Sequence, residues 1–283
     1  MEMKNPEMAE GKGTEGGTLP LSAFIICVNE EHYIANCLES LELCREIVIV
    51  DSGSTDATMS VIQSYIDKGW PIRLFSEPWR GYAGQKQFAL DQCQQEWCFN
   101  IDADERMDKA LKKILPELLE NKDFVGWKIA RRPYLIGYGY APAYAHERRN
   151  LRLIKRGHGS YDLDQKVHEG IRPDGPVEHS LEGSLLHFRA LPIERQILKE
   201  NRYSSLKSEQ LVETGQGPRY IRILFNPPLY FFRLYFHNGL WRCGFPGFIE
   251  AMTGAVYSFL TETKIFQRNV MRDKPPFDDF DKQ

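Results

Sequence analysis

The alternation of short apolar runs with helical patterns in the first half of the chain constrains its fold most. Apolar runs at 21–28, 46–50, 72–75 and 97–101 are typical of buried strands. Helical patterns follow them at 31–44, 55–68, 84–93 and 108–120, with Thr55 or Asp56 and Asp108 placed to cap helices. This order predicts an α/β fold, in which helices flank a mostly parallel, Rossmann-like sheet.

After Phe124 the alternation stops. Residues 125–190 are rich in Tyr, Gly, Arg and His and hold short strand-like pieces. A helical pattern returns at 193–211, and beyond Arg219 the chain becomes aromatic and basic. We therefore expect the second half to complete the first domain and to end in a helical, aromatic-rich region.

The composition excludes several classes of protein. The 283 residues are 42% hydrophobic and 27% charged, with a net charge of −3, which argues against a disordered, collagen-like or generally basic nucleic-acid-binding chain. We expect no nucleic-acid partner, no signal peptide and no simple transmembrane helix. The cysteines form no Cys-x-x-Cys pair and are expected to be reduced core thiols of a cytosolic protein; they are Cys27, Cys37, Cys44, Cys93, Cys98 and Cys243.

Polar side chains follow three of the predicted strands. In open parallel sheets, ligands bind outside the carboxyl ends of the strands, near the point where the strand order reverses. Asn29, Asp51 and Asp102 fall at such ends, and Glu30 and Ser52 come directly after two of them. We expect these residues to line one crevice, where a carboxylate can accept the ring N–H of a pyrimidine. The alternative for the segment around Asp51 is a merely structural capped loop.

The segment Ile101–Glu105 carries two carboxylates one residue apart, just past a buried strand. Asp102 and Asp104 can hold one hard divalent cation, which usually keeps waters and binds substrate phosphates. A role in a loop or a helix cap is the alternative. If Asp108 caps the next helix, Glu105 is also left for other work.

Together these motifs resemble family 2 of the inverting GT-A glycosyltransferases, most closely the bacterial lipopolysaccharide inner-core β-glucosyltransferase branch. The resemblance covers about Leu21 to Phe266. It is carried by I-x-C-x-N-E-E, I-V-I-V-D-S-G-S-T-D-x-T and N-I-D-A-D-E-R, and by G-Y-A-G-Q-K-Q-F-A-L, N-L-R-L-I-K-R-G and V-H-E-G. The Q-x-x-R-W signature of processive synthases is absent, so we expect single additions.

The resemblance implies a nucleotide-diphosphate sugar as donor and Mg²⁺ or Mn²⁺ as cofactor. Asn29, Glu30, Asp51 and Ser52 would form the nucleotide pocket. The other implied donor residues are Gln85, Lys86 and Asp102, and Asp104 would hold the metal with Asp102 beside it. Two alternatives stay open, namely that Lys86 is a helix-surface lysine and that His187 is a core histidine rather than a third metal ligand.

An inverting transfer needs one general base close to the acceptor hydroxyl. Glu169 in the V-H-E-G motif occupies the position where the family has its base, and His168 is placed to orient it. A surface glutamate is the alternative for Glu169, and Asp162 and Asp164 are the fallback bases.

Two blocks of the chain are basic. Between Lys128 and Arg156 there are eight Lys and Arg residues against Glu147 alone. Since guanidinium groups bind phosphate bidentately, we expect an anionic saccharide acceptor. Its expected ligands are Arg131, Arg148, Arg149 and Arg152, and solvated surface arginines are the alternative.

The second basic block, from Arg219 to Arg272, holds seven Lys and Arg residues against two acids. Its apolar and aromatic segment 223–236 contains Pro227 and Pro228, which with the charges argue against a simple span. Such a stretch can lie among lipid headgroups of the inner membrane. A buried helical subdomain or a dimer contact is the alternative.

These expectations combine into one function. We expect transfer of a hexose, glucose from UDP-glucose, to a lipopolysaccharide core or related lipid-linked glycan by a cytoplasmic, peripherally membrane-associated enzyme. The expected organisation is a disordered leader at 1–18, a nucleotide-sugar-binding half at 19–124, an acceptor-binding and catalytic half at 125–215 and a membrane-associating helical region at 216–283. The alternatives are another cell-surface glycan as acceptor and a non-catalytic nucleotide-sugar-binding protein.

Overall fold

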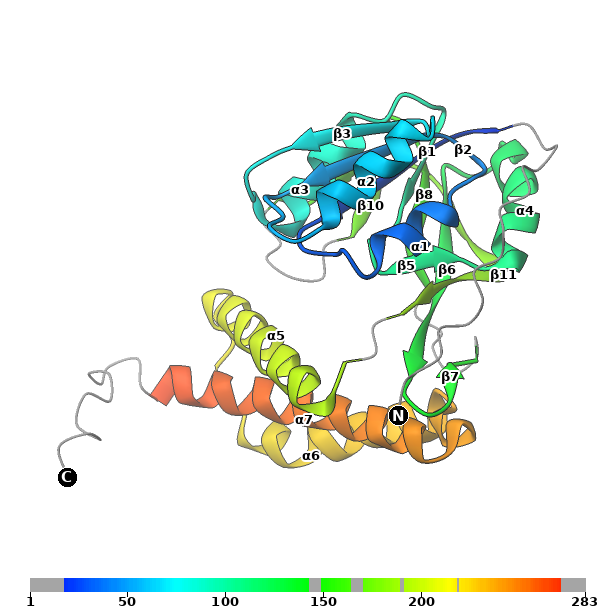
Figure 1. Cartoon of the computed structure of the whole chain (residues 1–283). Coiled ribbons are helices and arrows are strands. Elements are labelled where there is room, and N and C mark those ends of the chain that lie inside the picture. Colours follow the sequence, from blue (N-terminus) through cyan, green and yellow to red (C-terminus); the bar gives the residue numbers. More distant parts are fainter. Residues whose placement is uncertain (1–17, 143–148, 164–169, 189–190, 218, 271–283) are drawn as a thin grey trace.

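The computed structural model describes residues 18–142, 149–163, 170–188, 191–217 and 219–270. They form an α/β unit and a layer of helices beneath it in the view of Figure 1. The predicted leader, apart from Thr18, lies outside the described residues. So do Arg148, Asp164, His168 and Glu169.

The first half of the chain folds as the alternation predicts. Its elements are β1 (Leu19–Cys27), α1 (Ile34–Glu39), β2 (Cys44–Asp51), α2 (Thr58–Asp67), β3 (Ile72–Ser76), α3 (Gly81–Asp91), β4 (Trp97–Asn100), β5 (Glu105–Met107) and α4 (Lys109–Glu120). Strands β1 to β4 pair in parallel in the order β3-β2-β1-β4. The three-residue strand β5 is too short to show any periodicity, and the sequence pattern did not predict it.

The second half extends this sheet. Its strands are β6 (Gly126–Leu135), β7 (Gly139–Tyr140), β8 (Arg149–Lys155), β9 (Gly159–Tyr161), β10 (Ile171–Pro173) and β11 (Val177–His187). The sheet continues past β4 as β8-β6-β11-β5. Strand β8 is antiparallel to both β4 and β6, whereas β11 is parallel to β6. Strand β8 therefore lies directly beside β4, the strand that precedes the Asp-x-Asp segment.

Helices cover both faces of the sheet, and the predicted fold class is confirmed. On one face α1, α2 and α4 pack on the larger core through Leu38, Ile62 and Leu111, all fully buried. On the other face α3 packs on a second core together with β9 and β10. All six cysteines are buried and free, as expected of core thiols.

The two predicted helix caps differ in outcome. Asp108 caps α4 as predicted, because its Oδ1 accepts the Leu111 N–H at 2.7 Å. The cap predicted at Thr55 or Asp56 is wrong, since Ala57 is the N-cap of α2 and makes no side-chain capping bond. Asp56 instead accepts the Thr58 N–H at 3.0 Å, inside the turn that precedes the helix.

The C-terminal unit contains α5 (Ile193–Glu213), α6 (Tyr220–Phe232), a π-helical turn (Arg233–His237), a 3₁₀ turn (Leu240–Cys243) and α7 (Gly244–Val270). Helix α7 packs against α5 on one side and α6 on the other (Figure 1). Lys264 Nζ of α7 donates to Asn201 Oδ1 of α5 at 2.7 Å. The helical unit therefore begins at α5, earlier than the predicted boundary at 215/216.

A third apolar core joins the two units. Leu135 at the end of β6 packs with Leu234, Leu240 and Ala251 of the C-terminal helices. The β6–β7 hairpin thus reaches down from the sheet onto the helical layer (Figure 1). The α/β unit and the C-terminal helices are in this way held in one structure.

Glu46 is a buried carboxylate that ties three strands of the sheet together. It accepts a hydrogen bond from Ser22 of β1, the Gln94 N–H at 2.8 Å and the Arg73 guanidinium of β3 at 2.6 Å. Burial alone would raise the pKa of this carboxyl, but these three partners outweigh it and lower the pKa below 4.5. The ionised form of Glu46 therefore contributes to stability at neutral pH.

We predict that Glu46→Gln lowers the free energy of unfolding at pH 7 by about 2–3 kcal/mol. Because the folded pKa lies below the unfolded one, the wild-type contribution is complete above the unfolded value and is lost as the pH falls through the folded one. Urea unfolding of both proteins at pH 7 and near pH 3 tests this. An equal stability gap at both pH values would contradict it.

Candidate functional site

The strand order of the sheet reverses at β1, which lies between β2 and β4. The residues that follow these three strands therefore meet at one edge, where open α/β sheets bind ligands. Asn29 and Glu30 follow β1, Asp51 ends β2, and Asp102 follows β4. The structure brings these predicted site residues together at the carboxyl edge.

Asp51 organises the loop that follows β2. Its residue is 3% exposed, and Oδ2 accepts the N–H groups of Gly53 and Ser54, both at 2.9 Å. Oδ1 accepts from the Ser54 hydroxyl. A base that donates its ring N–H to Asp51 must therefore compete with Ser54 for Oδ1. Contact between Asp51 and a nucleotide stays a prediction.

Asn29 holds the same loop from the other side. Its backbone has a φ of 55°, a left-handed conformation that Asn tolerates better than most residues. Its Oδ1 accepts the Thr55 N–H at 2.8 Å, and the Glu30 N–H donates to Thr58 Oγ1 at 2.8 Å. The segment after β1 and the segment after β2 are thus one hydrogen-bonded wall of the crevice.

Gln85 lies inside the molecule rather than at the surface of α3. It is fully buried, and its Nε2 donates to Ser52 Oγ at 3.0 Å and to the Glu77 carbonyl oxygen at 3.1 Å. This places Gln85 behind Ser52, where it fixes the ends of β2 and β3. Direct contact of either residue with a donor stays a prediction.

Lys86 settles one of the open alternatives. It is 7% exposed, so it is not a helix-surface lysine, and its Nζ lies 3.1 Å from Asp102 Oδ1. Helix α3 presents it to the Asp-x-Asp segment from the face opposite α1. The weak apolar periodicity of α3 left this orientation open in the sequence.

Asp102 is held by a second cation from β8. Arg152 Nη2 donates to Asp102 Oδ2 at 3.2 Å and to Glu105 Oε1 at 2.9 Å, and Nη1 donates to Asn100 Oδ1 at 2.7 Å. Burial alone would raise the pKa of Asp102, but Lys86, Arg152 and Arg131 outweigh it and hold that pKa well below its usual range. Asp102 is therefore ionised at neutral pH.

Asp104 lies next to His187, the last residue of β11. His187 Nε2 is 3.1 Å from Asp104 Oδ2, and the Phe188 N–H donates to the Asp104 carbonyl oxygen at 3.0 Å. His187 is 8% exposed, so it is buried as a core histidine would be and still adjoins the candidate metal ligand.

Carboxylate and imidazole are both ligands of Mn²⁺, and Mg²⁺ is usually bound by one or two carboxylates plus substrate phosphates. Asp104 and His187 provide such a partial set. Among the described residues, no group of three or more His, Cys, Asp or Glu side chains is arranged to hold a metal ion.

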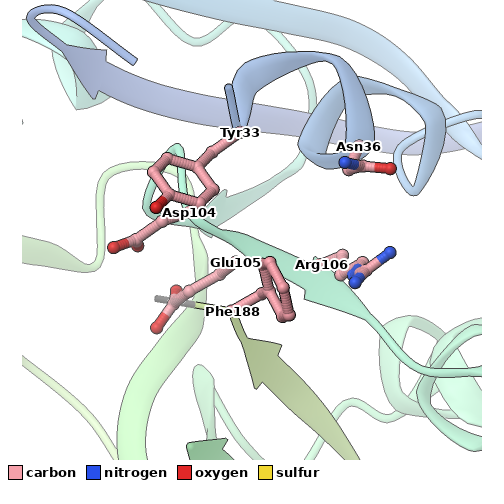
Figure 2. A pocket seen from close by; sticks show the side chains of 6 residues that line it. All are labelled: Tyr33, Asn36, Asp104, Glu105, Arg106 and Phe188. Carbon is pink, nitrogen blue, oxygen red and sulfur yellow. The ribbon is translucent and has the colours of Figure 1, made fainter. Parts of the chain in front are cut away.

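A shallow pocket opens beside Asp104. Its lining residues are Tyr33, Asn36, Asp104, Glu105, Arg106 and Phe188 (Figure 2). In Figure 2 the Asp104 and Glu105 carboxylates point to one side of β5 and the Arg106 guanidinium points to the other. Arg106 Nη2 donates to the Tyr140 hydroxyl at 2.7 Å, which links the pocket to the β6–β7 hairpin.

Two of the four predicted acceptor arginines have surroundings that we did not expect. Arg152 is 6% exposed and bridges Asp102 and Glu105, and Arg131 Nε donates to Glu105 Oε1 at 2.6 Å. Arg152 is buried in its ion pairs, which counts against acceptor contact by this residue. The Arg131 side chain is 34% exposed beside its ion pair, and acceptor contact by it stays a prediction. Arg149 is the first residue of β8, and its contact with the acceptor stays a prediction.

The general base is not placed by the structure. Glu169, His168 and the fallback base Asp164 lie outside the described residues, as does Arg148. The other fallback base, Asp162, is described and forms an ion pair with Arg172. Base catalysis by any of them stays a prediction.

Comparison with known proteins agrees with the predicted fold and family. The model of "Glycosyl transferase family 2" matches residues 22–161. The chain is 68% identical over 262 residues to the "Lipopolysaccharide core biosynthesis glycosyltransferase LpsC" of Rhizobium meliloti, covering 92% of this chain and 97% of that one. It is 29% identical to an uncharacterised glycosyltransferase of Rickettsia bellii, over 88% of this chain and 86% of that one.

A solved structure shows the same fold. It is the mannosyltransferase PcManGT from Pyrobaculum calidifontis, in complex with GDP-Man and Mn²⁺. The TM-score is 0.52 at 17% identity, over 93% of this chain and 92% of that chain. The likeness to this structure and the sheet order show a fold of the GT-A class. Given the 68% identity along nearly the whole of both chains, the chain belongs to glycosyltransferase family 2.

Proposed function

We propose that this enzyme transfers one hexose, glucose from UDP-glucose, to a lipopolysaccharide core or a related lipid-linked glycan. The single observation that carries the acceptor class is the 68% identity to a lipopolysaccharide core glycosyltransferase, over 97% of that relative. The donor class is supported by the crevice at the ends of β1, β2 and β4, where such sheets bind nucleotides.

The proposed reaction is a single displacement with inversion at the anomeric carbon. Asp51 and the loop after β2 would hold the nucleotide base of the donor, and Asp102 with Lys86 would face the ribose and the diphosphate. The proposed general base, Glu169, takes the proton of the acceptor hydroxyl as that oxygen attacks the anomeric carbon. Asp104, with His187 beside it, is the proposed holder of Mg²⁺ or Mn²⁺, and a bound divalent ion stabilises the charge of the departing nucleoside diphosphate.

A donor screen tests this proposal. The purified enzyme is incubated with UDP-glucose, UDP-galactose or GDP-mannose, a divalent metal and truncated lipopolysaccharide cores. We expect the acceptor to gain the mass of one hexose from UDP-glucose, with a β linkage from the α-configured donor by NMR. Retention of configuration would contradict the single displacement, and no transfer from any donor would overturn the proposed function.

The acceptor is proposed to lie at the inner membrane, and the surface of α6 supports this. Its large exposed side chains recur every three to four residues and are apolar or aromatic; they are Tyr220, Ile221, Leu224, Phe225, Leu229 and Phe232. The inner side of α6 carries Asn226, whose Nδ2 donates to Glu262 Oε1 of α7 at 2.7 Å, and Tyr230 and Phe231, which pack on the third apolar core. The outer side of α6 is therefore apolar, where an ordinary surface helix is polar.

The exposed apolar surface continues beyond α6. Phe236, Trp241, Phe245, Phe248, Ile249, Met252 and Phe259 are also exposed. We call these residues, together with the six on α6, the apolar face. Ring stacking joins some of its members, Phe232 with Phe236 and Phe245 with Phe248. Exposed apolar side chains gathered in this way are typical of a membrane or protein contact. The exposure of these side chains supports a contact surface over a buried helical subdomain.

Charge favours a lipid surface as the partner. Arg219, Arg233 and Arg242 are exposed at or beside the apolar face. The two acids of α7, Glu250 and Glu262, are only partly exposed and accept hydrogen bonds from Gln196 and Asn226. Exposed arginines around apolar side chains suit the headgroups of anionic lipids. Within the described part of the chain, the structure has no helix with the length and hydropathy needed to cross a bilayer. The apolar face and the exposed arginines beside it support a helix that lies in the membrane interface.

A further inference from the structure

Glu105 is the most deeply buried carboxylate near the donor crevice. Its residue is 1% exposed, yet each of its oxygens accepts hydrogen bonds. Oε1 accepts from Arg131 Nε at 2.6 Å and from Arg152 Nη2 at 2.9 Å, and Oε2 accepts the Asp102 N–H at 3.1 Å. One side chain thus contacts the Asp-x-Asp turn directly and also holds two arginines around it.

The position of Arg152 depends on Glu105. Its Nη2 group is shared between two carboxylates, at 2.9 Å from Glu105 and 3.2 Å from Asp102. Glu105 makes the shorter of these contacts and binds Arg131 as well. The guanidinium groups are thereby drawn toward β5, and Asp102 retains a side chain that is 30% exposed at the crevice.

The charges of the cluster show what Glu105 balances. Lys86, Arg131 and Arg152 carry three positive charges, and Asp102 and Glu105 carry two negative ones. If Glu105 were neutral, Asp102 would be the only anion facing three cations. Since Coulomb attraction is strong in a buried cluster, both arginines would then turn toward Asp102.

We propose that Glu105 is a positioning residue for the donor site: it fixes the Asp102 turn, holds Arg131, and shares Arg152 with Asp102, so that neither arginine pairs with Asp102 alone. Asp102 then stays available to the nucleoside diphosphate and its cation. This inference rests on the proposed function, because it assigns Asp102 to the donor. Glu105 itself touches neither donor nor acceptor.

Binding of UDP with Mn²⁺, measured by calorimetry, tests the proposal without any turnover. Glu105→Gln keeps the volume of the side chain and removes its charge, and we expect it to weaken UDP binding by about tenfold or more. Glu105→Gln/Arg131→Gln restores the net charge of the cluster. We expect this double variant to bind UDP within about threefold of the wild-type protein.

The same series distinguishes positioning from a purely structural role. Glu117→Gln, on the exposed side of α4, is the matched control and should bind UDP as the wild-type protein does. If Glu105 only filled space, Glu105→Gln would lower the melting temperature and leave UDP affinity within about twofold, which would overturn the proposal. A double variant that remains tenfold weaker than wild type would also overturn it, and this comparison holds even if the single variant does not fold.

Hydrogen exchange adds a readout that needs no ligand. The Asp102 N–H donates to Glu105 Oε2, so its exchange should become faster in folded Glu105→Gln and remain slow in Glu117→Gln. Unchanged exchange at Asp102 would count against the positioning contact. A wild-type protein that binds no nucleoside diphosphate would instead overturn the proposed function, which keeps the two failures apart.

Discussion

Replacing Asp104 with asparagine is expected to lower the rate of sugar transfer by about a thousandfold or more. The variant keeps the size of the side chain and removes the negative charge that faces the proposed metal. Its fold should be retained, because Asp104 contacts His187 and the Phe188 N–H rather than the apolar core. Single-turnover transfer from UDP-glucose at saturating Mn²⁺ measures the effect.

The matched control for this variant is Asp123→Asn. Asp123 is exposed in the loop after α4, and the Asp123→Asn variant should retain full transfer activity. Circular dichroism of both variants separates loss of the site from loss of the fold. Transfer by Asp104→Asn within about tenfold of the wild-type rate would show that Asp104 is not the metal ligand, since the lost charge would then matter little to the transition state.

The carboxyl edge of the sheet was predictable because its elements are local. Each strand and the helix after it form one continuous pattern, and a parallel sheet places the ends of such strands on one side. Asn29, Asp51 and Asp102 were located in this way, and so was the cap at Asp108. The general base was expected on the resemblance alone and lies outside the described residues.

The surroundings of Asp102 were not predictable from local patterns. Arg152 reaches Asp102 only because β8 inserts next to β4 in antiparallel register, and the two residues are 50 positions apart in the chain. The sequence showed Arg131 and Arg152 as members of a basic block, which suggested a surface. Only the strand order turns them inward, where they serve Glu105.

For the C-terminal helices, composition indicated the kind of surface but not how the helices pack. The apolar and aromatic composition of α6 indicated a surface to be covered, but composition does not say which side of a helix its neighbours occupy. Pro227 and Pro228 were expected to oppose a simple span, and α6 continues through both before the π-helical turn at 233–237. The packing of α6 decides the outcome, because Asn226, Tyr230 and Phe231 face inward and Leu224, Phe225 and Leu229 remain outside.

Replacing Leu224, Phe225 and Leu229 with serine is therefore expected to reduce binding to anionic vesicles by about a hundredfold or more. These side chains are 71%, 56% and 62% exposed, so the substitutions remove apolar surface without opening the core. Each large side chain buried in lipid contributes about 1.5–3 kcal/mol. Flotation with vesicles of phosphatidylcholine and phosphatidylglycerol measures the loss.

The matched control carries Leu163→Ser, Leu181→Ser and Leu198→Ser, three leucines that are equally exposed but lie outside the apolar face. It should float within about twofold of the wild-type protein, because lipid binding depends on where the apolar surface lies rather than on its total amount. Vesicles of phosphatidylcholine alone should bind the wild-type protein more weakly, since their surface has no net negative charge to attract Arg219, Arg233 and Arg242. The apolar face could instead join two copies of the chain. Sedimentation would then show a dimer for the wild-type protein and a monomer for the variant with Leu224, Phe225 and Leu229 replaced, and both proteins would float equally. That result would replace the membrane proposal with a dimer.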